Sequence, residues 1–82
     1  MALVEGQFYA VGRSDSIVPI NVIIYENGAV VVTAEDEHIT EHQFRKAVAD
    51  QYPGFAIRFE HDKKYGYYRA DFRAKTQRGD ES

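Results

Sequence analysis

The residues whose types and spacing could do chemistry begin with a histidine pair in the middle of the chain. His38 and His42 flank Glu41 in the order H-x-x-E-H, which is the pattern of inverted zinc proteases. That chemistry needs both imidazoles on one helical face, a carboxylate beside them and a third metal ligand. Thr40 is of the type that caps a helix, so His38 would precede the helix. We therefore expect two exposed histidines, with no metal and no cofactor.

Other catalytic patterns are missing. The sequence has no glycine-rich phosphate loop, no G-x-S-x-G and no cysteine nucleophile. Residues 14–16 (Ser-Asp-Ser) are neighbours in one predicted loop, which does not make a triad, and no histidine is spaced as their base. Residues 78–80 spell Arg-Gly-Asp on a polar tail, and we interpret this as chance. The sequence therefore predicts a protein that is not an enzyme.

Acidic side chains gather just before the predicted helix. They are Glu35, Asp36, Glu37 and Glu41. One interpretation is a solvated loop whose charges favour the positive end of the helix dipole. The other is an acidic surface that binds a protein partner.

Basic and aromatic side chains gather on the outer face and in the turn of the last predicted hairpin. They are Arg58, Lys63, Lys64, Tyr65, Tyr67, Arg69 and Arg73. Cations for phosphates and a flat ring for bases are what a single-stranded nucleic acid needs. Glu60 and Asp71 fall on the same face, however, and could pair across the strands with the arginines. A solvated face of ion pairs is therefore the competing interpretation.

Length and composition limit the class of protein. The chain has 82 residues, 44% of them hydrophobic, no cysteine and a net charge of -3. It is long enough for one small domain and excludes a disulfide or cysteine–zinc scaffold. No apolar run could span a membrane, and we expect a cytoplasmic protein. The charge is unevenly divided, with one base and seven acids in residues 1–44 and nine bases and six acids in residues 45–82.

The elements that must position these residues begin with a hairpin. Residues 20–26 and 29–34 are rich in β-branched side chains and flank Asn27-Gly28, which predicts a two-residue type I′ turn. Tyr25 would then lie opposite Val30, and both faces of the hairpin would be apolar. Because one helix covers one face, the first strand, the chain ends or a second copy must shield the other. We expect an interface there, most simply a two-fold dimer. The predicted partner-binding residues here are Val22, Ile24, Tyr25 and Val31.

The remaining elements follow from periodicity. A capping box at Thr40 and Gln43 and a stop at Pro53 predict a helix over residues 41–51. Alternation predicts a first strand at 7–11 and a last hairpin of strands 55–60 and 67–73. The fold class is α+β, a single domain at 1–75 with a polar flexible tail at 76–82. An N-terminal strand precedes ββαββ, in which one short helix joins two hairpins and packs on one face of a mainly antiparallel sheet.

Together these features predict a non-enzymatic binding protein that acts by protein–protein association. A protein partner, a possible homodimer and no membrane are expected. Small compact domains without motifs are frequent among phage-encoded and mobile-element inhibitors of host machinery, including anti-defence proteins, which supplies the specific hypothesis. The alternatives are a single-stranded RNA- or DNA-binding module that uses the last hairpin, and a structural or assembly subunit.

Overall fold

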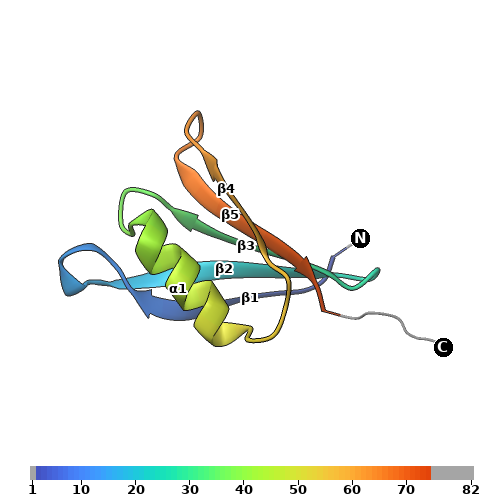
Figure 1. The fold of residues 1–82 in the computed structure, drawn as a ribbon. Helices are drawn as coiled ribbons and strands as arrows, with labels where there is room; N and C mark the ends of the chain where they lie inside the picture. Colours follow the sequence, from blue (N-terminus) through green and yellow to red (C-terminus); the bar gives the residue numbers. More distant parts are fainter. Residues whose placement is uncertain (1, 75–82) are drawn as a thin grey trace.

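The computed structural model describes residues 2–74, with the backbone alone for residues 2 and 3, and places in them five strands and one α-helix. The strands form one antiparallel sheet in the order β1-β2-β3-β5-β4, and α1 lies across one face of it (Figure 1). The elements are β1 (Ala2–Val11), a short 3₁₀ turn η1 (Arg13–Asp15), β2 (Ile17–Tyr25), β3 (Ala29–Glu35), α1 (Glu41–Gln51), β4 (Arg58–Asp62) and β5 (Tyr67–Arg73). The predicted tail at 76–82 lies outside the described residues.

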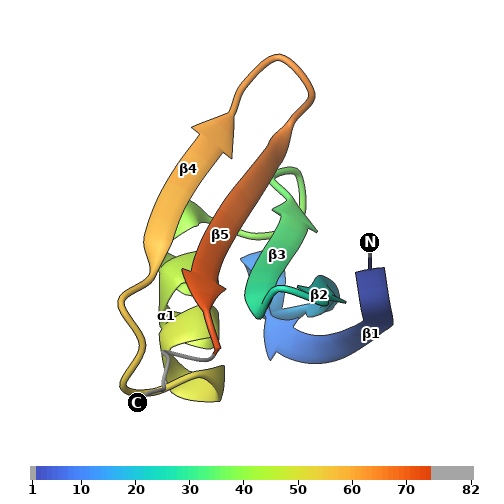
Figure 2. The same cartoon turned by 90° about the vertical axis from the view of Figure 1, so that its right-hand side faces the viewer.

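The structure is a small α+β domain with one helix on an antiparallel sheet, which confirms the predicted fold class. The second hairpin joins the first through its last strand, because β5 pairs with β3 and β4 lies outside β5 (Figure 2). The two strands that α1 connects, β3 and β4, therefore run in the same direction but are not neighbours. Element order alone could not show that β5 lies between them.

The bounds of α1 are those predicted from its capping box and from the stop at Pro53. The Thr40 side chain accepts a hydrogen bond from the Gln43 backbone N–H at 3.1 Å, and the Gln43 side chain accepts one from the Thr40 N–H at 3.0 Å. The Gln43 amide also donates to the carbonyl of Gly12 at 2.9 Å. The cap therefore satisfies two N–H groups at the helix start and ties α1 to the end of β1.

The predicted register of the first hairpin was wrong by one residue. Ile24 pairs with Val30 and Val22 with Val32, so the turn holds three residues rather than two. A type I′ turn needs positive φ at both central residues, but of Asn27 and Gly28 only Gly28 has it, at +88°. The shift moves Val30 and Val32 to the face of Val22 and Ile24, and leaves Val31 on the opposite face.

Three strand starts also differ from the prediction, and one of them is β2, which begins at Ile17 rather than residue 20. β1 begins at Ala2 rather than residue 7 and pairs with β2 along nearly its whole length, with a register shift between Ala2 and Val4. β4 begins at Arg58 rather than residue 55. Phe55 instead lies in the loop after α1, where its ring centroid is 4.9 Å from that of Phe72. The alternation of residues 55–57 thus reflects a loop that packs on the core.

The core lies between α1 and the face of the sheet that it covers. Phe44 of α1 is 1% exposed, stacks on Tyr68 at a centroid distance of 5.7 Å and meets Phe59 edge to face at 6.1 Å. No polar or charged residue of the described part is buried. The buried residues are Val18, Ile20, Val22, Val30, Val32, Ala34, Ile39, Phe44, Val48, Tyr68, Ala70 and Phe72.

Candidate functional site

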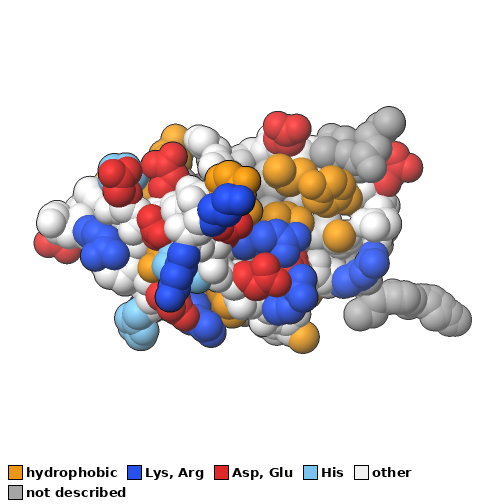
Figure 3. Space-filling view, turned by 90° about the horizontal axis from the view of Figure 1, so that it is seen from above, with side chains coloured by type: hydrophobic (Ala, Val, Ile, Leu, Met, Phe, Trp, Pro, Cys, Tyr) orange, Lys and Arg blue, Asp and Glu red, His pale blue; other side chains and the backbone are white. Residues whose placement is uncertain are grey.

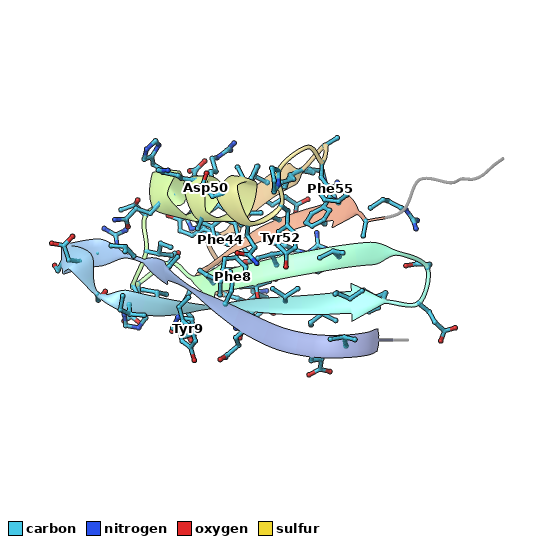
Figure 4. The ribbon with its side chains drawn as sticks, turned by 90° about the horizontal axis from the view of Figure 1, so that it is seen from below. Phe8, Tyr9, Phe44, Asp50, Tyr52 and Phe55 are labelled. Atoms are coloured by element: carbon cyan, nitrogen blue, oxygen red, sulfur yellow. The ribbon has the colours of Figure 1, made fainter. Side chains whose placement is uncertain are left out.

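The face of the sheet opposite α1, here called the open face, carries an apolar cluster at one end. The register places Tyr9 beside Pro19 and Val11 beside Ile17, where β1 and β2 approach their shared turn. Tyr9 is 65% exposed, Val11 54% and Ile17 66%. Figure 4 shows Tyr9 pointing away from α1, whereas Phe8 points toward it. We call Tyr9, Val11, Ile17 and Pro19 the apolar end.

The predicted apolar binding residues are divided between the two faces. Val22 is 7% exposed in the core, and Ile24 packs against the core from the same face. Tyr25 and Val31 lie on the open face, half-buried beside neighbouring strands. Val22 therefore cannot contact a partner in the folded domain, because it lies with Val18 and Ile20 on the face of β2 that α1 covers.

Sequence reasoning did not single out the apolar end as a binding surface. Its signal was present in the alternation of Phe8 and Ala10 with Tyr9 and Val11 along β1. Phe8 meets Tyr52 of the helix end at a centroid distance of 6.1 Å, which fixes the face that β1 buries. The other two side chains of the alternation must then point to the open face.

Two of the predicted basic residues are held in an ion-pair network on the open face. Arg58 lies 3.0 Å from the carboxylate of Asp71 and 3.3 Å from Glu60, and Arg69 binds the same Asp71. The hydrogen bond from Arg58 holds the pKa of Asp71 below its ordinary value, and the same bond raises the pKa of Arg58. Figure 3, which looks down on the β4–β5 hairpin, shows acidic and basic side chains intermixed.

The aromatic part of the predicted nucleic-acid face has acidic neighbours. Tyr67 pairs with Asp62 of β4 on one side and with Glu35 of β3 on the other. Arg73 donates to the carbonyl of Asn27 at 2.6 Å. Tyr67 therefore lies between acidic residues at one end of β5, whereas Arg73 lies at the other end, bound to a backbone carbonyl.

The β4–β5 turn carries the other predicted basic and aromatic residues. Lys63 and Lys64 are exposed there, and the Lys64 ammonium lies 5.4 Å from the ring centroid of Tyr65. Tyr65 is 72% exposed. Lys64 and Tyr65 form a cation–ring pair at the tip of the hairpin, separate from the arginine network.

The predicted acidic residues pair locally with basic groups. Asp36 lies 2.8 Å from His61 of β4, and Glu41 lies 3.0 Å from Arg45 one helical turn on. These contacts join the loop after β3 to the second hairpin and support the first turn of α1.

The H-x-x-E-H pattern does not form a helical metal site. Because α1 begins at Glu41, His38 lies in the preceding loop. There it is 3.6 Å from Glu35 and 4.0 Å from Glu37, and one possible ligand atom from each of the three residues lies within 4.8 Å of the others. All three are exposed, and we assign the cluster no function.

The two edges of the sheet differ in length and chemistry. β4 forms one edge and has five residues. Four of them carry charged or ionisable side chains, namely Arg58, Glu60, His61 and Asp62. β1 forms the other with ten residues, which hold a single charge at Glu5 and neither lysine nor proline. Within residues 2–74 no strand pairs with the outer side of β1. Charges, proline and shortness are the usual protection of an edge, so β1 is the less protected one.

Comparisons with protein-family models, with curated protein sequences and with solved structures found no match to this chain. The described helix is too short and too polar to cross a membrane.

Proposed function

We propose that this chain is a non-enzymatic binding protein that acts by protein–protein association through the apolar end and the free side of β1. One observation carries the proposal: Tyr9, Val11 and Ile17 lie together on one face, and each is more than half exposed. Clustered exposed apolar side chains mark interaction sites more often than isolated ones do. Tyr9 is suited to anchor a partner, because its ring offers a large contact area at low entropic cost.

The charged surfaces would orient the partner rather than supply most of the affinity. Four of the charged side chains on the second hairpin already form ion pairs with one another. An outside polyanion would have to break these pairs before it could bind the arginines. This favours a protein partner over a single-stranded nucleic acid. An inhibitor of host machinery of the phage or mobile-element kind is the specific form of the proposal, and it rests on size and the lack of catalytic motifs.

The proposal is tested by affinity capture from a lysate of the source cells, with and without nuclease. Two variants are compared, Ile17→Asp at the apolar end and Asn21→Asp, an exposed position on the same face of the same strand. We expect a protein that survives nuclease and moderate salt, is lost with Ile17→Asp and is kept with Asn21→Asp.

The nucleic-acid alternative gives the opposite pattern. Capture would then vanish on nuclease treatment, fall steeply with salt and be abolished by Arg69→Glu, because phosphate contacts release counterions. Such a result would overturn the proposed function.

A further inference from the structure

We infer that the partner of β1 is a second copy of this chain, whose own β1 pairs with it antiparallel about a two-fold axis near Gln7. The two sheets would then form one continuous sheet of ten strands. This inference rests on the proposed function, since it names the partner of the same part of the molecule. It adds a mode of recognition, backbone pairing along an edge, in which Tyr9 and Val11 lie on the paired strand while Ile17 and Pro19 lie one strand farther in.

The free edge is long enough to support such pairing. β1 keeps a regular register with β2 from Val4 to Val11, so its outer backbone groups are already held in an extended row. Figure 4, seen from below, shows β1 at the margin of the sheet, with α1 toward the top of the view. A preordered strand loses little further backbone entropy when a partner strand docks.

Symmetry restricts the register. Opposite residues of an antiparallel pair point to the same face, and a two-fold axis perpendicular to the sheet keeps each face on its own side. The two positions paired by the axis must therefore both be odd or both be even. An axis at Gln7 meets this condition and keeps residues 3–11 paired, which is nearly the whole strand.

The side chains of β1 suit this register. Glu5 would face Tyr9 of the partner rather than another carboxylate, so the single charge of the strand meets no like charge. Gly6 would face Phe8 of the partner. No atom other than its chain neighbours lies within 4 Å of the place where a Cβ would stand on Gly6, so the space beside it can take an aromatic ring.

The groove beside the edge is also compatible with a two-fold partner. It lies between β1 and α1, has a volume of about 430 Å³ and is bordered by Phe8, Lys46 and Asp50. Lys46 and Asp50 form an ion pair at 2.9 Å, so the helical wall carries no excess of either charge. Two such walls brought together on the same face would not repel each other.

The absence of cysteine from the chain makes the register directly testable. Gln7→Cys would lie opposite itself across the axis, with Cα atoms about 4.5–5.5 Å apart, which a disulfide spans. In the Tyr9→Cys protein alone, each cysteine would lie opposite position 5 of the partner, four residues from the partner's cysteine, and should not cross-link. A mixture of Glu5→Cys and Tyr9→Cys proteins should cross-link with each other.

A charge placed on the axis gives an independent test. Gln7→Lys puts two lysines opposite each other, whereas Asn21→Lys adds the same charge one strand farther in. Both substitutions remove the same hydrogen bond, from the Gln7 amide to the Asn21 side chain at 3.0 Å. Sedimentation of the untagged chain should show a 9.4 kDa species that is replaced by one of twice that mass as the concentration rises. Gln7→Lys should raise the dimer Kd at least about fivefold, and Asn21→Lys should change it little.

A chain that stays monomeric up to millimolar concentration, with Gln7→Cys uncross-linked, overturns the inference. So does a dimer that the two lysine variants weaken equally, because its interface would then lie elsewhere. Neither result decides the proposed function, which is judged by the Ile17→Asp capture. Conversely, a Gln7-centred dimer without any captured protein keeps the inference and limits the association to self-association.

Discussion

The substitution Gly12→Ala offers the sharpest test of the structure, because Gly12 lies where three segments meet. Its N–H donates to the carbonyl of Ser16 at 2.7 Å, and its own carbonyl accepts from Gln43 of α1 at 2.9 Å. The next N–H, of Arg13, donates to the carbonyl of His38 at 2.8 Å. The end of β1, the turn η1 and the loop before α1 are thus joined at one position.

The close approach around Gly12 sets the magnitude of the effect. A Cβ there would stand 2.2 Å from the carbonyl oxygen of His38 and 2.4 Å from a methyl of Val18, so backbone must move. Overpacking costs about 1–3 kcal/mol, and each hydrogen bond lost in the shift adds about 1 kcal/mol. We expect a loss of about 2–4 kcal/mol. A chain of this size has a free energy of unfolding of about 4–12 kcal/mol, so the loss would be a large share of it.

Urea unfolding followed by circular dichroism measures this loss, at a concentration where the chain is monomeric. The matched control is Gly6→Ala on the same strand, where a Cβ meets nothing within 4 Å. Alanine there should leave the stability equal or raise it by up to about 1 kcal/mol, since glycine is unfavourable in a strand. In thermal melts Gly12→Ala should lower Tm by about 10–30 °C. Equal midpoints for the two variants would refute the reasoning.

Three further substitutions test the cap, the ion pairs and the core. Thr40→Ala should cost about 1 kcal/mol in urea unfolding through loss of the capping box, whereas His42→Ala, at an exposed helical position, should not. Asp71→Asn should destabilise the domain at neutral pH. Because the hydrogen bond from Arg58 lowers the folded-state pKa of Asp71, this contribution is present above the unfolded pKa of about 3.9. It is lost as pH falls through the lower folded value, so the two proteins should converge in stability in acid. Phe44→Ala should cost about 3–5 kcal/mol and shift the urea midpoint accordingly, and a loss under about 1 kcal/mol would contradict its place in the core.

The helix could be predicted from sequence because its signals are local. Thr40 and Gln43 satisfy each other within one turn, and Pro53 prevents continuation. None of these interactions depends on the rest of the sheet. The alternation of β5 was equally local, and the structure buries Tyr68, Ala70 and Phe72 as that alternation requires.

The candidate site could be predicted only in part, because it depends on register and on pairing between distant strands. Asn27-Gly28 is compatible with both a two-residue and a three-residue turn, and only the burial of Val30 and Val32 against α1 decides between them. The length of β1 was missed for a similar reason. The first residues of β1 are extended because they pair with β2. Their residue types alone do not predict a strand.

The uneven charge of the chain takes on a different meaning in the folded domain. Most of the described ion pairs lie within one element or one hairpin, such as Lys46 with Asp50 and Arg58 with Asp71. Many of the basic side chains in residues 45–82 are therefore neutralised by acidic side chains close to them in the same element or hairpin. β1 stands outside these pairs, with Glu5 as its single charge. Association along β1 should therefore depend on backbone pairing and apolar burial, both of which salt screens little. A dimer that dissociated steeply with salt would point away from β1 and toward contact between the acidic surface of one copy and the basic surface of another.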